Sequence, residues 1–390
     1  VILTICILIL IAYIFDLTSK HTKIPTVLLL LILGWGVQQI TFYLSVPMPN
    51  LELLLPLLGT VGLILIVLEG SLGLELNRNK TKVLVSSSAS ALFATLLLLT
   101  SFGLLFSFLS GEGILKCILN GLPLCVISSA IAIPSVANYS SETKEFVVYE
   151  SSFSDIIGVI LFNFFLVNEV INLSSFGSFV FEIIIMLLIS LSVSIGLAFL
   201  IKRIDHHVKF VPILMMIILI YSLSKIYHLP SLIFILIFGL FLNNLDQLKQ
   251  FSFIRNLEPE KLDEEVGRFR EIVGEITFLV RTMFFLLFGY TIHIEQLIDV
   301  TTLVIAALVV TLIFLVRFFQ LKVSKTAVLP ALFVAPRGLI TVLLFLSIPQ
   351  HKLLPFVNES LILQVVILTV LMLALGSMVL KREKTTFKSE

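Results

Sequence analysis

The sequence predicts an all-α polytopic membrane protein with about 13 transmembrane helices, on the rule that each span needs about 20 mostly apolar residues. The chain has 390 residues, of which 58% are hydrophobic and only 13% are charged. That charged share is about half the share found in soluble domains. The lysines and arginines also gather in alternate loops. The net charge is +1, so bulk charge does not indicate nucleic acid as a partner.

The spans are justified in order by long apolar runs separated by short polar segments. Assigning alternate loops to opposite sides leaves only Lys116, Lys225 and Lys352 outside the lysine-rich and arginine-rich side. The positive-inside rule makes the rich side cytoplasmic. We therefore expect an integral protein of the plasma (inner) membrane, with the N-terminus outside and the C-terminus in the cytoplasm. The predicted spans are 1–16, 24–44, 52–75, 83–109, 114–138, 145–168, 176–201, 208–227, 229–245, 271–292, 297–321, 326–348 and 355–380.

The spans divide into two halves of six around one connecting helix. Because a single span separates the halves, they have opposite topology, which is the inverted-repeat plan of secondary transporters. The predicted domains are a first six-helix repeat, the connecting helix, a second inverted repeat that contains a charged cytoplasmic linker, and a basic tail. Their bounds are 1–168, 169–207, 208–380 with the linker at 246–270, and 381–390.

The fifth span of each half carries a helix breaker. The first contains Pro134, and the second contains Pro336 and Gly338. Proline removes a backbone donor and clashes with the preceding turn, so carbonyl groups such as that of Ala132 become available. One such helix alone would be an ordinary kink. Two at matching positions predict an ion site built on broken helices.

Five ionisable residues lie well inside apolar spans, where a buried charge must be paired, neutralised or in contact with water. Arg317 and Glu275 lie nearer span ends, and we expect both to reach water by snorkelling. The five inner residues are Glu69, Glu150, Asp155, Arg281 and Arg337.

Asp155 has the features of an ion-binding carboxylate. It lies about ten residues into its span, or roughly 15 Å, which is close to the middle of the bilayer. Ser151 is four residues away and shares its helix face. Burial favours the protonated carboxyl group, so a proton and a metal cation compete for Asp155. A carboxylate, the Ser151 hydroxyl and carbonyls near Ala132 would suit a hard monovalent cation.

Glu150 points elsewhere, because five helical residues place it about 140° around the axis from Asp155. It is predicted to form a structural ion pair with Arg337, which would hold two helices in register.

At these residues the chain resembles a known family. "YESSFSD" is similar to the E-S-x-x-N-D signature of the monovalent cation:proton antiporter superfamily, in the sodium/proton exchanger branch of the single-Asp, electroneutral type. "LIVLEGSLGLEL" resembles the F-E-G-A-L segment of that branch, "VAPRGLITVLL" its R-G segment, and "MFFLLFGYTI" its F-F-x-x-x-G segment. The four motifs occur in the family's order over nearly the whole chain.

The resemblance implies roles for individual residues. Asp155 would bind the proton and the cation, and Ser151 and Glu69 would help to coordinate the cation or its water. Glu150 and Arg337 would form the structural pair. It also implies a homodimer and an elevator-like movement of a six-helix core against a dimerisation domain.

The sequence departs from the family pattern in three places, one of which is a shorter link from Pro134 to Asp155 than in typical members. Ser154 stands where the family has asparagine, and it can still form hydrogen bonds. The family's Thr-Asp-Pro at the first break reads Ala132-Ile133-Pro134, without the hydroxyl and the acid. Arg281 is also unexpected, and it would neutralise Glu69, replace the partner network of the missing acid, or serve in a purely structural pair.

The expected function is exchange of a monovalent cation, sodium or potassium, for a proton by alternating access. Exchange at the single unpaired carboxylate of Asp155 would be electroneutral. The alternatives are a cation channel, a sodium-coupled symporter on the same fold, and a transport-impaired sensor. No cofactor is expected beyond the transported ions, and the partners are those ions and the lipid bilayer. The six histidines lie in loops or near span ends, so an enzyme is not expected.

Overall fold

The structure is a computed structural model, and every regular element in its described part is helical. This confirms the predicted all-α fold class. The described residues are 2–22, 24–45, 54–74, 81–136, 139–168, 170–203, 209–227, 229, 231–248, 259–292 and 298–379. The linker at 246–270 is therefore described only at its two ends, and the basic tail 381–390 lies outside the described residues.

Within those ranges, nine helical segments are long and apolar enough to cross a membrane. One of them, Ile114–Ser135, is composed of α5 (Ile114–Gly121), η2 (Leu122–Leu124) and α6 (Ser129–Ser135). The other eight are α2 (Thr26–Tyr43), α3 (Leu54–Leu72), α4 (Thr81–Ser110), α7 (Ser141–Val167), α8 (Leu173–Arg203), α12 (Pro259–Tyr290), α14 (Val300–Val323) and α17 (Glu359–Val379).

Shorter apolar helices occupy the remaining predicted spans. The predicted span 326–348 contains two of them, α15 (Val328–Ala331) and α16 (Leu339–Leu346), separated by non-helical backbone. The protein is thus an integral membrane protein, whereas the count of 13 spans and the inverted repeat stay predictions. The other short helices are α1 (Ile2–Thr22), α9 (Phe210–Ile226), α10 (Ser231–Asn243), η3 (Leu245–Leu248) and η4 (Gln350–Lys352).

The helix surfaces have the distribution expected of a membrane protein. On α14, Ala306, Val309 and Ile313 are buried, while Leu308 and Phe319 are exposed. Many other large apolar side chains are exposed in the described part of the chain. Exposure on this scale is rare on soluble monomers, but it carries no cost on a helix that faces hydrocarbon. One face of α14 therefore packs in the protein, and the other is suited to lipid.

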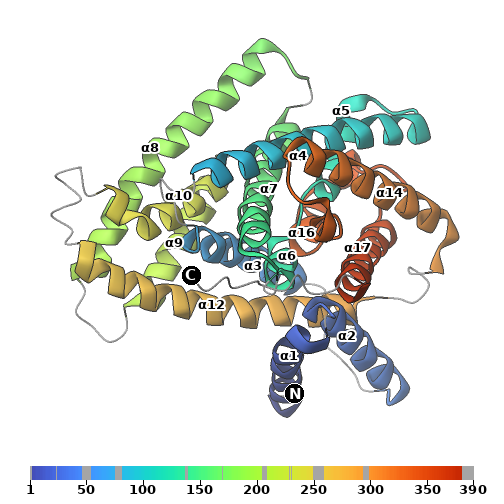
Figure 1. Cartoon of the computed structure of the whole chain (residues 1–390), viewed down its shortest axis with the longest axis horizontal. Helices are drawn as coiled ribbons and strands as arrows, with labels where there is room; N and C mark the ends of the chain where they lie inside the picture. Colours follow the sequence, from blue (N-terminus) through green and yellow to red (C-terminus); the bar gives the residue numbers. More distant parts are fainter. Residues whose placement is uncertain are drawn as a thin grey trace, which may run out of the picture. The chain divides into compact units, whose positions relative to one another are not determined.

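The chain forms two compact units, each discontinuous in sequence. The first comprises Val1–Gly59, Val85–Gly158 and Arg281–Glu390, and the second comprises Thr60–Leu84 and Val159–Val280. In the first unit α14 packs against α17, and in the second α8, α9 and α10 pack together (Figure 1). The domain boundaries expected from the sequence stay predictions.

Candidate ion-binding site

Two interrupted helices lie in the first unit. In the first, non-helical backbone at Cys125–Ser128 separates η2 from α6. Pro134 lies inside α6, so the prediction that Pro134 marks the break is wrong by about two helical turns. In the second, residues 332–338 separate α15 from α16, and Pro336 and Gly338 both lie in this stretch.

The two interruptions contact each other, at a place that we call the crossing. The Ser128 N–H donates to the Pro336 carbonyl oxygen over 2.9 Å, and η2 packs against α16. A Cβ atom built on Gly338 would lie 2.7 Å from Ser128 Oγ and 2.7 Å from Ile131 Cδ1. A side chain at position 338 would therefore require the Ser128 and Ile131 side chains to move.

Asp155 lies beside this crossing. It is on α7, with 4% of its side chain area exposed, and its Oδ2 accepts a hydrogen bond from the Ser129 hydroxyl at the start of α6. Its Oδ1 is buried and has no hydrogen-bond partner among the described residues. A buried carboxylate oxygen without a donor is costly unless the group is protonated or bound to a cation.

Ser154, the neighbour of Asp155, holds the unwound backbone in place. Its Oγ accepts a hydrogen bond of 3.0 Å from the Ile127 N–H, a donor that has no helical partner at the break. Ser154 on α7 thus accepts a hydrogen bond from the backbone at the break, and the next residue, Asp155, provides the carboxylate. A Cβ at Gly158, three residues beyond Asp155, would collide with Val126, so α7 approaches the same stretch closely.

The two other oxygen donors predicted for the cation differ in their placement. Ser151 is fully buried on α7, and its hydroxyl donates to the Val148 carbonyl over 3.3 Å, so its lone pairs stay available to a cation. The Ala132 carbonyl lies inside α6 and already accepts a hydrogen bond of 2.6 Å from Ser135 Oγ. The role of the Ala132 carbonyl as a cation ligand stays a prediction.

Glu150 forms a buried ion pair, but with Arg317 on α14. The predicted pairing with Arg337 is corrected accordingly. Arg317 is 2% exposed, so the expectation that it snorkels to water is also wrong. Gln320, one turn further along α14, donates to the same Glu150 oxygen and to Ser90 Oγ on α4 over 3.0 Å. The network joins α4, α7 and α14.

Arg337 binds carbonyl groups instead. Its Nε donates to the Leu124 carbonyl over 2.7 Å, and its Nη1 donates to the Ala335 carbonyl over 3.3 Å. Its backbone N–H donates to Thr369 Oγ1 on α17 over 3.0 Å. Leu124 is the last residue of η2 before the first break. The Arg337 side chain, which extends from the non-helical stretch between α15 and α16, therefore stabilises the carbonyl end of η2 in the other interrupted helix.

Glu69 and Arg281 are both partly buried, on α3 and α12 respectively. Glu69 Oε1 would lie 3.7 Å from a Cβ at Gly274 on α12, within the second unit. Arg281 belongs to the first unit. The predicted roles of Glu69 at the cation and of Arg281 in charge compensation stay predictions.

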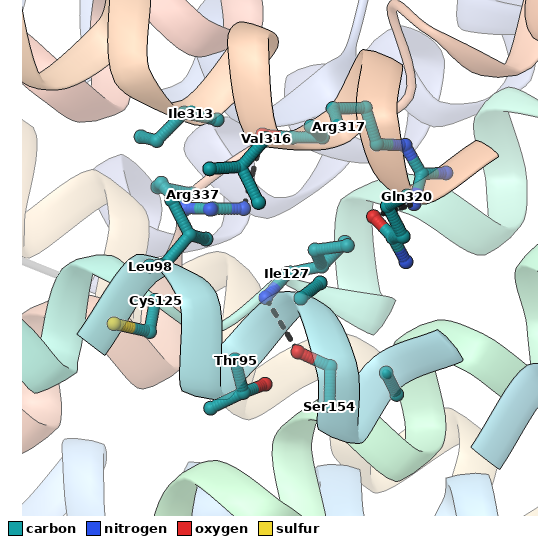
Figure 2. Close-up of a pocket in the computed structure, with 13 residues that line it drawn as sticks. Thr95, Leu98, Cys125, Ile127, Ser154, Ile313, Val316, Arg317, Gln320 and Arg337 are labelled. Atoms are coloured by element: carbon teal, nitrogen blue, oxygen red, sulfur yellow. Dashed lines mark hydrogen bonds between the residues drawn. The ribbon is translucent and has the colours of Figure 1, made fainter. Parts of the chain in front are cut away.

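A small cavity lies next to the crossing, and 13 residues line it (Figure 2). Figure 2 shows Arg317 and Arg337 at this cavity together with Thr95 of α4, and a dashed line marks the bond from Ile127 to Ser154. The cavity has room for roughly one water-sized particle.

Sequence reasoning missed four residues: Ser129, Arg317, Gln320 and Thr369. A signal existed for two of them, because Ile313, Arg317 and Gln320 follow the i, i+4, i+7 spacing of one buried helix face. Ser129 had a weaker signal, as one of two adjacent serines in an apolar run. Nothing in the sequence pattern indicated Thr369.

The comparisons with known proteins agree with this geometry of interrupted membrane helices around a buried carboxylate. The family described as sodium/hydrogen exchanger, transmembrane, matches residues 6–382. The chain therefore belongs to the sodium/hydrogen exchanger family, whose members are transporters and not enzymes. No curated protein matches the sequence.

Two solved structures of the sodium proton antiporter MjNhaP1 from Methanocaldococcus jannaschii are similar to this chain. The structure at pH 8 has a TM-score of 0.67 and 19% sequence identity, and the match covers 97% of this chain and 95% of that one. The structure from an electron-microscopy map has a TM-score of 0.69 and 18% identity, with the same coverage of 97% and 95%. At this identity the similarity shows a shared fold.

Proposed function

We propose that this chain exchanges sodium ions for protons across the membrane, with Asp155 as the group for which the two ions compete. The observation that carries the proposal is the state of this carboxylate. It is buried in α7 beside the two interrupted helices, and none of the described residues forms a hydrogen bond with one of its oxygens. Membership of the sodium/hydrogen exchanger family and the similarity to a sodium proton antiporter favour sodium over potassium.

The ligands follow from the atoms around Asp155. Sodium prefers oxygen ligands, as hard cations do. Asp155 supplies a carboxylate, and the hydroxyls of Ser129 and Ser151 supply neutral oxygens. Glu69, which the family resemblance implies as a ligand of the cation or its water, stays part of this proposal. The same Ser129 hydroxyl that donates to Asp155 would turn its lone pairs toward the bound ion.

Charge balance gives the expected stoichiometry. Glu150 is neutralised by Arg317, so Asp155 is the carboxylate that changes its charge during transport. It carries either one proton or one sodium ion, and both complexes are neutral. An empty, ionised site would be the charged form, and moving it through hydrocarbon is costly. Alternating access with one proton exchanged for one cation therefore moves no net charge.

The surrounding network would keep the site rigid while it moves. Arg337 joins the two interrupted helices, and the network of Glu150, Arg317 and Gln320 joins α4, α7 and α14. We further propose a homodimer in the plasma membrane, with the N-terminus outside and the C-terminus in the cytoplasm. The lysine and arginine distribution supports this orientation.

The test is proton flux in reconstituted vesicles that contain an internal pH dye. Sodium is added as a pulse, then potassium in a separate run, with and without valinomycin and potassium to clamp the voltage. The wild type is compared with Asp155→Asn, which keeps the size of the side chain but removes the titratable group.

Each outcome decides a separate point. Sodium-driven pH recovery that is unchanged by the clamp and absent in Asp155→Asn would support electroneutral exchange through Asp155. A pH recovery with potassium but not with sodium would identify potassium as the transported cation in place of sodium. Cation flux without proton flux would indicate a channel or a symporter. No flux from folded wild-type protein would overturn the proposal and favour a sensor.

A further inference from the structure

We propose that the cavity between α4, α14 and the two interrupted helices binds a small monovalent anion, such as chloride, between Arg317 and Arg337. The observations are an unpartnered buried donor, a set of walls without acidic residues, and an excess of fixed positive charge. The charge argument rests partly on the proposed function, but the test below does not.

The unpartnered donor is Arg317 Nη2. The side chain is 2% exposed, and its other two nitrogens are used by Glu150, Gln320 and the Ala331 carbonyl. Nη2 is buried and has no hydrogen-bond partner in the part of the chain that the structure describes, although Arg317 lines the cavity. A buried N–H of a charged group without an acceptor is destabilising, because it has lost its hydration and gained no partner. An acceptor in the cavity would remove this cost.

The walls of the cavity consist of donors and apolar groups. Of the 13 lining residues, two are arginines and none is acidic. Thr95 and Ser154 add hydroxyl groups, and the Ser154 oxygen already accepts a hydrogen bond from Ile127, so its own hydrogen is the part it can offer. The remaining walls are mainly alanine, leucine, isoleucine and valine side chains. Such a lining fits an acceptor and excludes a cation.

The excess charge argues for an anion in preference to water. Around the cavity, Glu150 neutralises Arg317, while the described part of the chain gives Arg337 only carbonyl partners and no ion pair. In the proposed transport cycle Asp155 is neutralised by a proton or by sodium, so it does not balance Arg337 in either loaded state. A buried charge without a counter-charge is expensive. A water molecule in the cavity would satisfy the hydrogen bonds, but it would not balance the positive charge of Arg337.

The experiment measures the thermal stability of the full chain in detergent as chloride is replaced by gluconate. Sodium concentration and ionic strength are held constant, so that screening and cation binding do not change. Chloride and bromide are expected to raise the Tm saturably, by about 3–8 °C for a ligand present far above its dissociation constant. Gluconate, which is too large for the cavity, is expected to have no effect. Crystals soaked in bromide should show anomalous density beside Arg317 Nη2.

Matched variants locate the effect. Thr95→Val removes a hydroxyl from the cavity wall. It should raise the half-saturating chloride concentration about tenfold, the equivalent of one good hydrogen bond. Ala94→Leu fills the cavity and should abolish the chloride effect. Thr100→Val on the same helix is the control, because its exposed hydroxyl binds the carbonyls of Leu96 and Leu97.

Equal Tm values in chloride and gluconate, with no bromide density in the cavity, would overturn the proposal and leave a water molecule as the occupant. A halide effect of equal size in wild type, Ala94→Leu and Thr100→Val would also overturn it, because the site would lie elsewhere. These readouts do not require transport. If exchange fails in vesicles and the halide effect persists, only the proposed function is lost.

Discussion

The hydroxyl of Ser129 donates a hydrogen bond to Asp155 Oδ2, across the space between a short half-helix and the full-length helix α7. Ser129 is the first residue of α6, directly after the unwound stretch Cys125–Ser128. The conformation of the break therefore sets the position of the group that binds the carboxylate. Any change that moves the break changes the contacts of Asp155 as well.

The first prediction concerns Ser129. Ser129→Ala removes a hydrogen bond to a carboxylate, a contact of about 1.5–3 kcal/mol, so the apparent sodium affinity in exchange should fall about tenfold or more. Ser129→Thr keeps the hydroxyl and should retain most of the affinity. The control is Ser135→Ala on the same half-helix, whose hydroxyl binds only the Ala132 carbonyl. Equal sodium affinities in the wild type and Ser129→Ala would contradict the assigned contact.

The second prediction distinguishes the two arginines near Glu150. Replacing one partner of a buried ion pair costs about 3–5 kcal/mol, because the other charge stays buried. Glu150→Leu and Arg317→Met should each lower the free energy of unfolding by about this amount, and the double variant should recover much of the loss. Denaturant unfolding in mild detergent measures the coupling.

The comparison cycle replaces Arg317→Met by Arg337→Met. Arg337 binds carbonyl groups and has a different position in the network. Its effect should therefore be closer to additive with that of Glu150→Leu. A larger coupling energy between Glu150 and Arg337 than between Glu150 and Arg317 would support the Glu150–Arg337 ion pair that the sequence predicted.

The third prediction concerns the backbone of the first break. Ser154→Ala leaves the buried Ile127 N–H without an acceptor, which should destabilise the protein by about 1–3 kcal/mol. Ser154→Asn keeps an acceptor and should be milder. The matched control is Ser152→Ala, two residues away and also buried, whose hydroxyl binds the Val148 carbonyl in its own helix. Similar losses of stability for the alanine variants at 152 and 154 would argue against the contact with Ile127.

The fourth prediction tests the crossing itself. Gly338→Ala places a Cβ atom against the side chains of Ser128 and Ile131, which must then move next to Ser129, so both exchange rate and stability should fall. Adding Ser128→Gly removes one obstacle and should restore part of the activity. Gly36→Ala on α2 has open space around it and should be nearly neutral. Wild-type exchange in Gly338→Ala would show that the two chains do not approach this closely.

Much of the fold followed from apolar run lengths, because a membrane helix must satisfy its own backbone and bury or expose whole faces. The position of Asp155 followed from the same counting. The position of the first break did not follow from Pro134. Unwinding at Cys125–Ser128 is stabilised by tertiary partners, since Ser154 binds the Ile127 N–H and Pro336 binds the Ser128 N–H. No local pattern contains those partners.

The ion pair of Glu150 shows a second limit. Counting residues along a helix predicts the depth of a side chain in the membrane, but it does not reveal which way the side chain points. Arg317 lies within about two turns of the end of α14, where an arginine can reach water. Its helix face instead packs toward α7, and the buried face shared with Gln320 was the indication of this.

The bond between the Ser128 N–H and the Pro336 carbonyl belongs wholly to the main chain. An alanine scan leaves both atoms in place, so such a scan would not detect this junction. Only a change that deletes the N–H, such as Ser128→Pro, removes it. A substitution that leaves the main chain in place at these two positions therefore leaves this hydrogen bond in place as well.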